Sequence, residues 1–287
     1  MAAKCLNSVR MCWCFMQRIQ VKDFFEVDFG VGPFDKCINH LKESNVVLTS
    51  TEELAELRLC GSYKHTVSTH TVWIAESLNY LDEKTLVIAS RDYNQILKNP
   101  ELATKAHRAG NEFKLEGAVA KELRERAQSD PDEAIKSGVL LVEMASLQNI
   151  SVDALAENPT TRFLLRDNAR AYGQLLKTDH QLCYGNMFHV WFNSPEICHK
   201  NRPGLTPYAE PIWVDRIAPH KNSGICHTAD VQDDQFYRRL WGEGMAIGMR
   251  RIKDLSYVPE PIVKKRQGFI EFEGKNYIEV PETVFKK

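Results

Sequence analysis

The chain has 287 residues, with 37 Lys and Arg against 38 Asp and Glu, which gives a formal net charge of −1. Hydrophobic residues make up 43% and charged residues 26%, and this composition excludes a disordered, collagen-like or low-complexity chain. The balanced charge does not indicate a nucleic-acid partner. No apolar run approaches the roughly 18–20 residues needed to span a bilayer, so we expect no membrane partner.

The N-terminal region bears on the compartment in which the protein works. Its apolar run extends only from Met11 to Met16, which is too short for the core of a secretory signal. Together with eight cysteines in a long chain, this favours a reduced, cytoplasmic location. Residues 1–22 carry four basic residues and no acid, a pattern that also fits an organellar transit peptide.

Residues 1–98 are predicted to form a mixed N-terminal part. Apolar and polar residues alternate from residue 17 until Gly30, Gly32 and Pro33, which predicts a strand followed by a turn. Residues 45–50 and 84–90 are further strand candidates. Ser50 followed by Glu53 is typical of a capping box, so we expect a helix over 51–60.

Residues 99–178 are predicted to be a helical block. A long helix is expected to begin at Asn99-Pro100-Glu101, with Leu102 and Phe113 among its inward residues. Residues 131–147 are apolar enough to form a central buried helix, and residues 160–177 are expected to form another.

Residues 179–287 form the third predicted part. Five prolines exclude long helices over 179–229, after which a helix is expected over 230–255. Residues 267–280 predict a β-hairpin that turns at Gly274-Lys275. The predicted class is therefore α+β, with a mostly helical centre, a mixed N-terminal part and a C-terminal helix plus hairpin, in one or two compact domains.

Side chains of the types that can bind metal ions are concentrated between His180 and His227. This stretch holds five of the nine histidines and three of the eight cysteines, far more than even spreading would place there. Imidazole and thiolate are the ligands that zinc prefers, so we expect zinc to be the metal if one binds. The candidate ligands are His199, His220 and Cys226. The alternative is a set of buried free cysteines and hydrogen-bonded histidines in a packed loop.

His227 and Asp230 form a His-x-x-Asp pattern at the expected start of the last helix. This spacing brings an imidazole and a carboxylate to one side, where the acid can orient the histidine for acid–base work. We predict these two residues as the catalytic pair. The alternative is that Asp230 only caps the helix.

Four arginines of the C-terminal region are predicted to bind substrate. They are Arg238, Arg239, Arg250 and Arg251. A basic face of this kind can contact the phosphate groups of a ligand. The alternative is a solvated helix face. Gly242, Gly244 and Gly248 in the same stretch suggest close helix packing.

Short motifs resemble fragments of the flavin-dependent thymidylate synthases. They are Thr161-Arg162-Phe163, Asn168-Ala169-Arg170 and Ser90-Arg91 followed by Gln95. The central Arg-His-Arg motif of that family is absent, because the chain reads Ile-Leu-Lys-Asn-Pro after Gln95. The resemblance implies a diverged relative of these enzymes, and no site residue is carried over from it.

The main functional expectation is an intracellular enzyme that acts on a small polar or phosphorylated, nucleotide-like substrate. Its site is expected in the 180–250 region, with assistance from a metal. The alternative is a non-catalytic interaction or assembly protein, which explains the absence of a complete catalytic signature equally well.

Overall fold

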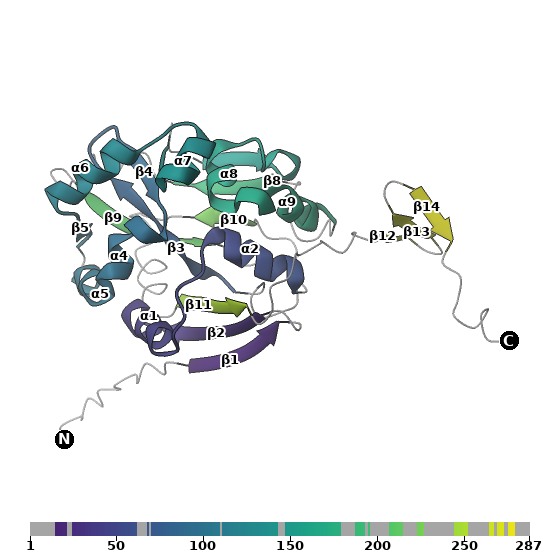
Figure 1. Cartoon of the computed structure of the whole chain (residues 1–287), viewed down its shortest axis with the longest axis horizontal. Helices are drawn as coiled ribbons and strands as arrows, with labels where there is room; N and C mark the ends of the chain where they lie inside the picture. The colour runs from purple at the N-terminus through teal and green to yellow at the C-terminus, as the bar shows by residue number, and fades with distance from the viewer. Residues whose placement is uncertain are drawn as a thin grey trace, which may run out of the picture.

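The computed structural model describes most of the chain from residue 15 to residue 278. The described residues are 15–21, 25–61, 68, 70–109, 111–142, 147–178, 187–192, 195, 207–214, 223–226, 244–251, 264–266, 269–272 and 275–278. Within them the protein combines helices with a large mixed sheet (Figure 1), so the α+β class is confirmed.

The large sheet has eleven strands, with the path β1-β2-β11-β3-β9-β10-β8-β7. The strands of this path are β1 (Phe15–Val21), β2 (Phe25–Gly32), β3 (Val72–Tyr80), β7 (Leu147–Ser151), β8 (Met187–Trp191), β9 (Tyr208–Val214), β10 (Ser223–Cys226) and β11 (Gly244–Arg251). The strands off the path are β4 (Leu86–Ala89), β5 (Phe113–Lys114) and β6 (Val139–Leu141). All three parts predicted from the sequence contribute strands to this one sheet.

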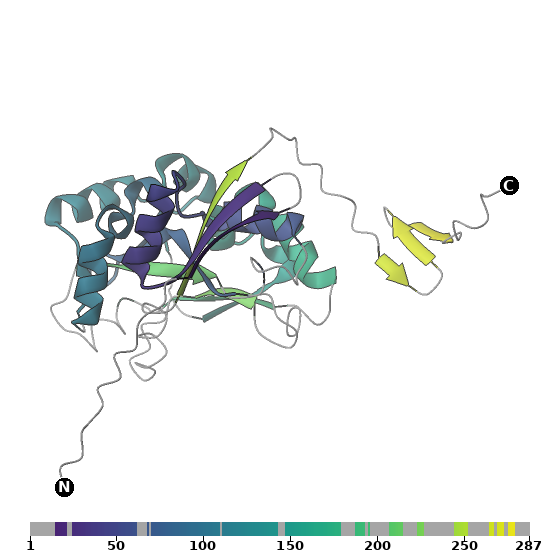
Figure 2. The same cartoon turned by 90° about the horizontal axis from the view of Figure 1, so that it is seen from below.

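The sheet is strongly twisted. In Figure 2 the purple β1 and β2 and the yellow-green β11 run steeply across the direction of the green β9 and β10. A second sheet of three antiparallel strands is formed by β12 (Lys264–Arg266), β13 (Phe269–Phe272) and β14 (Lys275–Ile278).

Helices cover both faces of the large sheet. They are α1 (Phe34–Glu43), α2 (Thr51–Cys60), α4 (Gln95–Lys98), α5 (Pro100–Arg108), α6 (Gly117–Arg126), α7 (Pro131–Ser137), α8 (Pro159–Leu165) and α9 (Ala169–Thr178). Three short 3₁₀ turns are η1 (Arg91–Tyr93), η2 (Val152–Ala154) and η3 (Arg166–Asn168). On β3, Val72 and Ile74 pack in the core with α2, α8 and α9, whereas Trp73 and Ala75 pack with α1 and α4–α6. This alternation is that of a strand buried on both faces.

Several local predictions are confirmed. The helix over 51–60 is α2, and its capping box is present, with Ser50 accepting from the Glu53 N–H. The strand predicted over 84–90 contains β4. The C-terminal hairpin is formed by β13 and β14, with Phe272 paired to Lys275, so Lys275, expected in the turn, is the first residue of β14.

The predicted helix over 131–147 is too long. It ends at Ser137 because Gly138 takes a left-handed backbone, with φ +80°, and stops the helix. Residues 139–141 then form β6, which pairs with β4. The expected burial is present in part: Val139, Leu140 and Val142 are buried, whereas Asp132, Glu133 and Lys136 of α7 are exposed.

The other long helices also differ from expectation. The helix that begins at Pro100 ends at Arg108, and β5 separates it from α6. Leu102 is exposed on α5 rather than facing the core. The helix predicted over 160–177 is present as α8, η3 and α9, interrupted where Arg166 adopts φ 48°.

The predicted helix over 230–255 is wrong where the structure describes it, because Gly244–Arg251 is the strand β11. Met245 and Ile247 lie two residues apart and point to one face of the sheet, as expected for a strand. The apolar residues of this stretch also fit a helical spacing, so their pattern alone does not distinguish the two conformations. Gly248 packs closely, as expected, but on a strand: a Cβ there would lie 2.7 Å from Val46 Cγ2. Pairing with β2 and β3 decides the conformation of this segment.

Candidate functional site: the sheet fork at the start of α2

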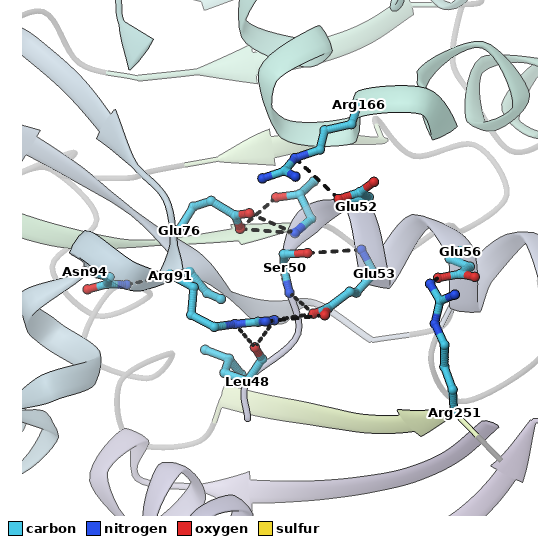
Figure 3. A network of polar contacts seen from close by, with 12 residues as sticks. Leu48, Ser50, Glu52, Glu53, Glu56, Glu76, Arg91, Asn94, Arg166 and Arg251 are labelled. Atoms are coloured by element: carbon cyan, nitrogen blue, oxygen red, sulfur yellow. Dashed lines mark hydrogen bonds and ion pairs between the residues drawn. The ribbon is translucent and has the colours of Figure 1, made fainter. Parts of the chain in front are cut away.

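A network of polar side chains lies where the large sheet divides beside β3 (Figure 3). Along one edge of β3, Val72 and Trp73 pair with β11, whereas residues 77–80 pair with β4. The opposite edge pairs with β9. We call the region between β11 and β4, around Ala75 and Glu76, the sheet fork.

The segment that leads into α2 fills the sheet fork. The Ala75 N–H donates to the Thr49 carbonyl oxygen at 2.8 Å, and the Thr49 N–H donates to the Ile247 oxygen at 2.8 Å. The Ala75 oxygen accepts from Asn94 Nδ2 at 2.9 Å. The backbone groups that the division of the sheet would leave without strand partners are therefore satisfied.

Glu76 projects from β3 at the fork toward the first residue of α2 (Figure 3). Its two carboxyl oxygens accept from the Thr51 N–H at 3.1 and 3.3 Å, and one also accepts from Thr51 Oγ1 at 3.1 Å. Burial raises the pKa of Glu76 from 4.5 to about 7, although the Thr51 hydrogen bonds and Arg91 oppose the shift. Desolvation of the charged form is the dominant cause.

Arg91 closes the fork from the η1 side. Its guanidinium donates to the Leu48 oxygen at 2.7 and 3.1 Å and forms a close ion pair with Glu53 (Figure 3). Glu53 also accepts from the Ser50 N–H at 2.7 Å. The Glu53 carboxylate thus completes the cap of α2 and also forms an ion pair with Arg91.

The remaining acids of α2 are bound to other elements. Glu52 forms an ion pair with Arg166 of η3 at 3.3 Å, and Asn168 Nδ2 donates to the Glu52 carbonyl oxygen at 3.2 Å. Glu56 accepts from Arg251 of β11 at 2.6 Å. Partial burial raises the pKa of both carboxyl groups, and their arginine partners oppose this shift.

The opposite end of α2 is held by a buried arginine. Arg58 donates to the Tyr172 hydroxyl of α9 at 2.9 Å and to the His70 carbonyl oxygen at 3.2 Å. His70 lies two residues before β3. Charge and hydrogen bonding therefore fix α2 at both ends, to β3, η1, η3, α9 and β11.

Several strands begin or end at one level of the sheet. The registers place Val72 of β3 beside Met245 of β11 and Val214 of β9, and Val214 beside Ile225 of β10. Ile225 pairs in turn with Val190 of β8. We call this level, together with the His70 end of α2, the strand-start end. The described residues His70, Val214 and Gly244 lie at or next to this level.

The polar side chains of the sheet fork hold β3, η1 and α2 together, and one of them, Glu76, is a proton-exchanging group. The carboxylates and guanidinium groups of the fork are matched to each other and to backbone groups, as described above. Glu76 is the group whose pKa lies near neutrality. Among the described residues, no three His, Cys, Asp or Glu side chains are arranged to hold a metal ion.

Most of the site residues predicted from the sequence lie outside the described residues. These are the predicted catalytic pair, two of the predicted metal ligands and two of the predicted substrate-binding arginines: His227, Asp230, His199, His220, Arg238 and Arg239. Their roles remain predictions.

Cys226, the third predicted metal ligand, ends β10 in register with Trp191 of β8. His189 lies two residues before Trp191 on β8, and its Nδ1 lies 2.6 Å from Asn149 Oδ1 of β7. The pairing of β8 and β10 thus brings one histidine and one cysteine of the enriched stretch onto neighbouring strands.

Arg250 and Arg251 lie on β11 and bind groups of the protein itself. Arg250 donates to the Ser44 oxygen at 2.9 Å and lies 3.4 Å from Glu26, and Arg251 forms the ion pair with Glu56. Because adjacent strand residues point to opposite faces, the two arginines do not form one basic face.

Glu76 and Arg58 are site residues that the sequence pattern did not predict, and Arg91 stood out in the sequence only within the family resemblance. Glu76 stands alone as an acid in the apolar strand Val72–Tyr80, and that isolation is a signal for a buried titratable group. Arg58 carries no such signal, because an arginine in the last turn of a helix is ordinary.

No family model and no curated protein sequence matches the chain. The resemblance to flavin-dependent thymidylate synthases therefore gains no support from these comparisons. No helix in the described part is both long and apolar enough to cross a membrane.

A solved structure from Nanoarchaeota is similar to the chain with a TM-score of 0.51 and 11% identity. The match covers 85% of this chain and 100% of the other. That structure is described as the "accommodation of massive sequence variation in Nanoarchaeota by the C-type lectin fold". The chain is therefore similar to a C-type lectin fold, and at this identity the likeness concerns the fold alone.

Proposed function

We propose that the chain is a non-catalytic interaction protein that binds a macromolecular partner at its strand-start end. The observation that carries the proposal is the fold likeness to a Nanoarchaeota protein whose C-type lectin fold accommodates massive sequence variation. Such variation requires a frame that remains folded while the connecting segments change. A frame of this kind suits recognition, because binding residues are often held on segments between rigid elements.

The frame at the strand-start end supports this proposal. Arg58 joins α2 to α9 and to His70, two residues before β3, and β3 is paired at this level on both edges. His70 and the start of β3 are thereby held in place. A surface held in place loses less conformational entropy when a partner binds to it.

The composition of several connecting stretches also supports binding. Five of the nine histidines of the chain, with aromatic and charged residues between them, belong to residues 62–71, 179–186, 215–222 and 227–243. Tyr, Ser, Asn, Trp and Arg dominate recognition surfaces because they combine contact area with adaptable hydrogen bonding. Residues 227–243 include Phe236, Tyr237, Arg238 and Trp241.

The test is position-dependent photo-crosslinking in the cells that make the protein. A photoreactive amino acid replaces His70, which is exposed at the strand-start end, and the matched control replaces Lys121 on the outer side of α6, which is also exposed. We expect one defined adduct from position 70 and none from position 121. Adducts from position 121 alone, or from neither position, would overturn the proposal.

An enzymatic function is the second candidate, favoured by the pairing of β8 and β10, which carry His189 and Cys226 on neighbouring strands. In this case the substrate is small and phosphorylated, His227 and Asp230 form the catalytic pair, and zinc is bound by Cys226 with His199 and His220. Mass spectrometry of the natively purified protein should then find stoichiometric zinc that is lost in His199→Ala or Cys226→Ala. A metal-free wild-type protein would remove this candidate.

A further inference from the structure

His189 stands in a row of three residues that crosses three strands of the large sheet. It is in register with Asn149 of β7 on one side and with Gly224 of β10 on the other. Its neighbours along β8, Phe188 and Val190, are buried in the core that includes α8 and α9. Because side chains alternate along a strand, the imidazole of His189 lies on the opposite face of the sheet.

One nitrogen of the His189 ring is held by the neighbouring strand. Its Nδ1 lies 2.6 Å from Asn149 Oδ1, and an amide oxygen can only accept a hydrogen bond. In the neutral ring the proton is therefore on Nδ1, and the lone pair is on Nε2. Histidines that bind metal ions are oriented in this way, with the second ring N–H donating to an oxygen of the protein.

The other ring nitrogen, Nε2, is buried and has no hydrogen-bond partner within the described part of the chain. A buried acceptor that is left unpaired destabilises a protein, so its presence points to a group that binds there. Gly224, the register partner of His189 on β10, has no side chain. A glycine inside a strand often marks a place where a ligand approaches closely.

The chemistry of the bound group follows from the neighbouring strand. β10 ends at Cys226, two residues beyond Gly224. Imidazole nitrogen and cysteine thiolate are the ligands that zinc prefers. We propose that His189 Nε2 binds a zinc ion together with the thiolate of Cys226, and that Asn149 is the positioning residue that holds the ring. This site goes beyond the proposed interaction function and does not depend on it.

His189 is an addition to the zinc ligands named for the enzymatic candidate. The other two histidines of that candidate, His199 and His220, lie outside the described residues, so the present proposal concerns His189 and Cys226 alone. No group of three metal-binding side chains is found in the described part. Because zinc takes four ligands, two positions beyond His189 and Cys226 remain for other groups or for water.

Zinc titration of the full chain, first stripped with a chelator, tests the site. The wild type should bind zinc. Asn149→Ala should weaken the affinity by about 10–100-fold, and His189→Gln should weaken it further because a ligand itself is lost. Asn149→Asp, whose carboxylate still accepts from Nδ1–H, should retain most of the affinity. The matched control is His40→Gln, which replaces another half-buried histidine, on α1, and should bind zinc as the wild type does.

Two spectroscopic measurements keep the test decisive if a variant folds poorly. In ¹⁵N NMR of the wild type, zinc should shift Nε2 of one histidine while Nδ1 of the same ring stays protonated. Cobalt in place of zinc should give a thiolate-to-cobalt charge-transfer band, which Cys226→Ala should remove and Asn149→Ala should retain.

The proposal would be overturned by a wild type that binds neither zinc nor cobalt. Equal zinc affinity in His189→Gln and in the His40→Gln control would also overturn it. Loss of zinc in His199→Ala but not in His189→Gln would refute the role of His189 and leave the enzymatic candidate standing. The photo-crosslinking from position 70 tests the interaction function separately.

Discussion

Gly173 on α9 shows how one buried residue sets the distance between two elements. A Cβ at this position would lie 2.0 Å from the Val152 carbonyl oxygen of η2 and 3.4 Å from Leu155. The obstructing atom belongs to the backbone, so it cannot move away as a flexible side chain would. α9 and η2 approach each other this closely because residue 173 has no side chain.

Gly173→Ala is therefore expected to destabilise the protein by about 1–3 kcal/mol, although alanine is the better helix former. Chemical denaturation with the two variants side by side measures the effect. The control is Gly117→Ala on α6, where nothing lies within 4 Å of the added Cβ. This control should be neutral or slightly stabilising, and similar midpoints for the two variants would contradict the packing argument.

At the scale of elements, the segment around β6 shows that the burial of a residue can be predicted correctly while its secondary structure is predicted wrongly. Val142 follows β6 and is buried, and its N–H donates to the Leu86 oxygen at 2.9 Å. The core position predicted for it is correct, although the helix predicted around it is not. Apolar composition indicates burial in either conformation.

Val142→Asp should destabilise the fold severely, by several kcal/mol, because it buries a charge without a partner. Leu102→Asp on α5 is the matched control, since Leu102 is 59% exposed and makes the same change of residue class. Thermal unfolding should show a large loss for the first variant and little change for the second. A melting temperature of Val142→Asp within about a degree of wild type would contradict the assignment of Val142 to the core.

At the scale of the whole molecule, the net charge of −1 gives little long-range attraction for a charged ligand. Any salt dependence in the binding of a phosphorylated ligand would therefore come from local arginines. Arg250 and Arg251 are bound to Glu26 and Glu56, so the structure gives them a role within the fold.

We expect the double variant Arg250→Ala, Arg251→Ala to leave the affinity for inorganic pyrophosphate unchanged in titration calorimetry at low and high salt. An affinity that falls with salt in the wild type, and is lost in the variant, would instead support the substrate-binding role predicted for these arginines. Arg238 and Arg239 would need their own variants, because their placement is not described.

The sequence alone determined the features whose causes lie within a few residues. The Ser50–Glu53 capping box, the prolines that open α5 and α7, and the C-terminal hairpin all depend on contacts between near neighbours. Alternation and turn residues then sufficed for the α+β class. The His and Cys enrichment also identified the region of His189 and Cys226, although not what it does.

Only the tertiary structure decided β6, β11 and the sheet fork. β11 pairs with β2, more than two hundred residues earlier, and its glycines and apolar residues allow a helix until those partners are known. Glu76 acquires its raised pKa from burial beneath α2, and Arg91 acquires its role from a carbonyl group 43 residues away. Local propensities differ by about 1 kcal/mol or less per residue, so pairing and desolvation between distant segments override them.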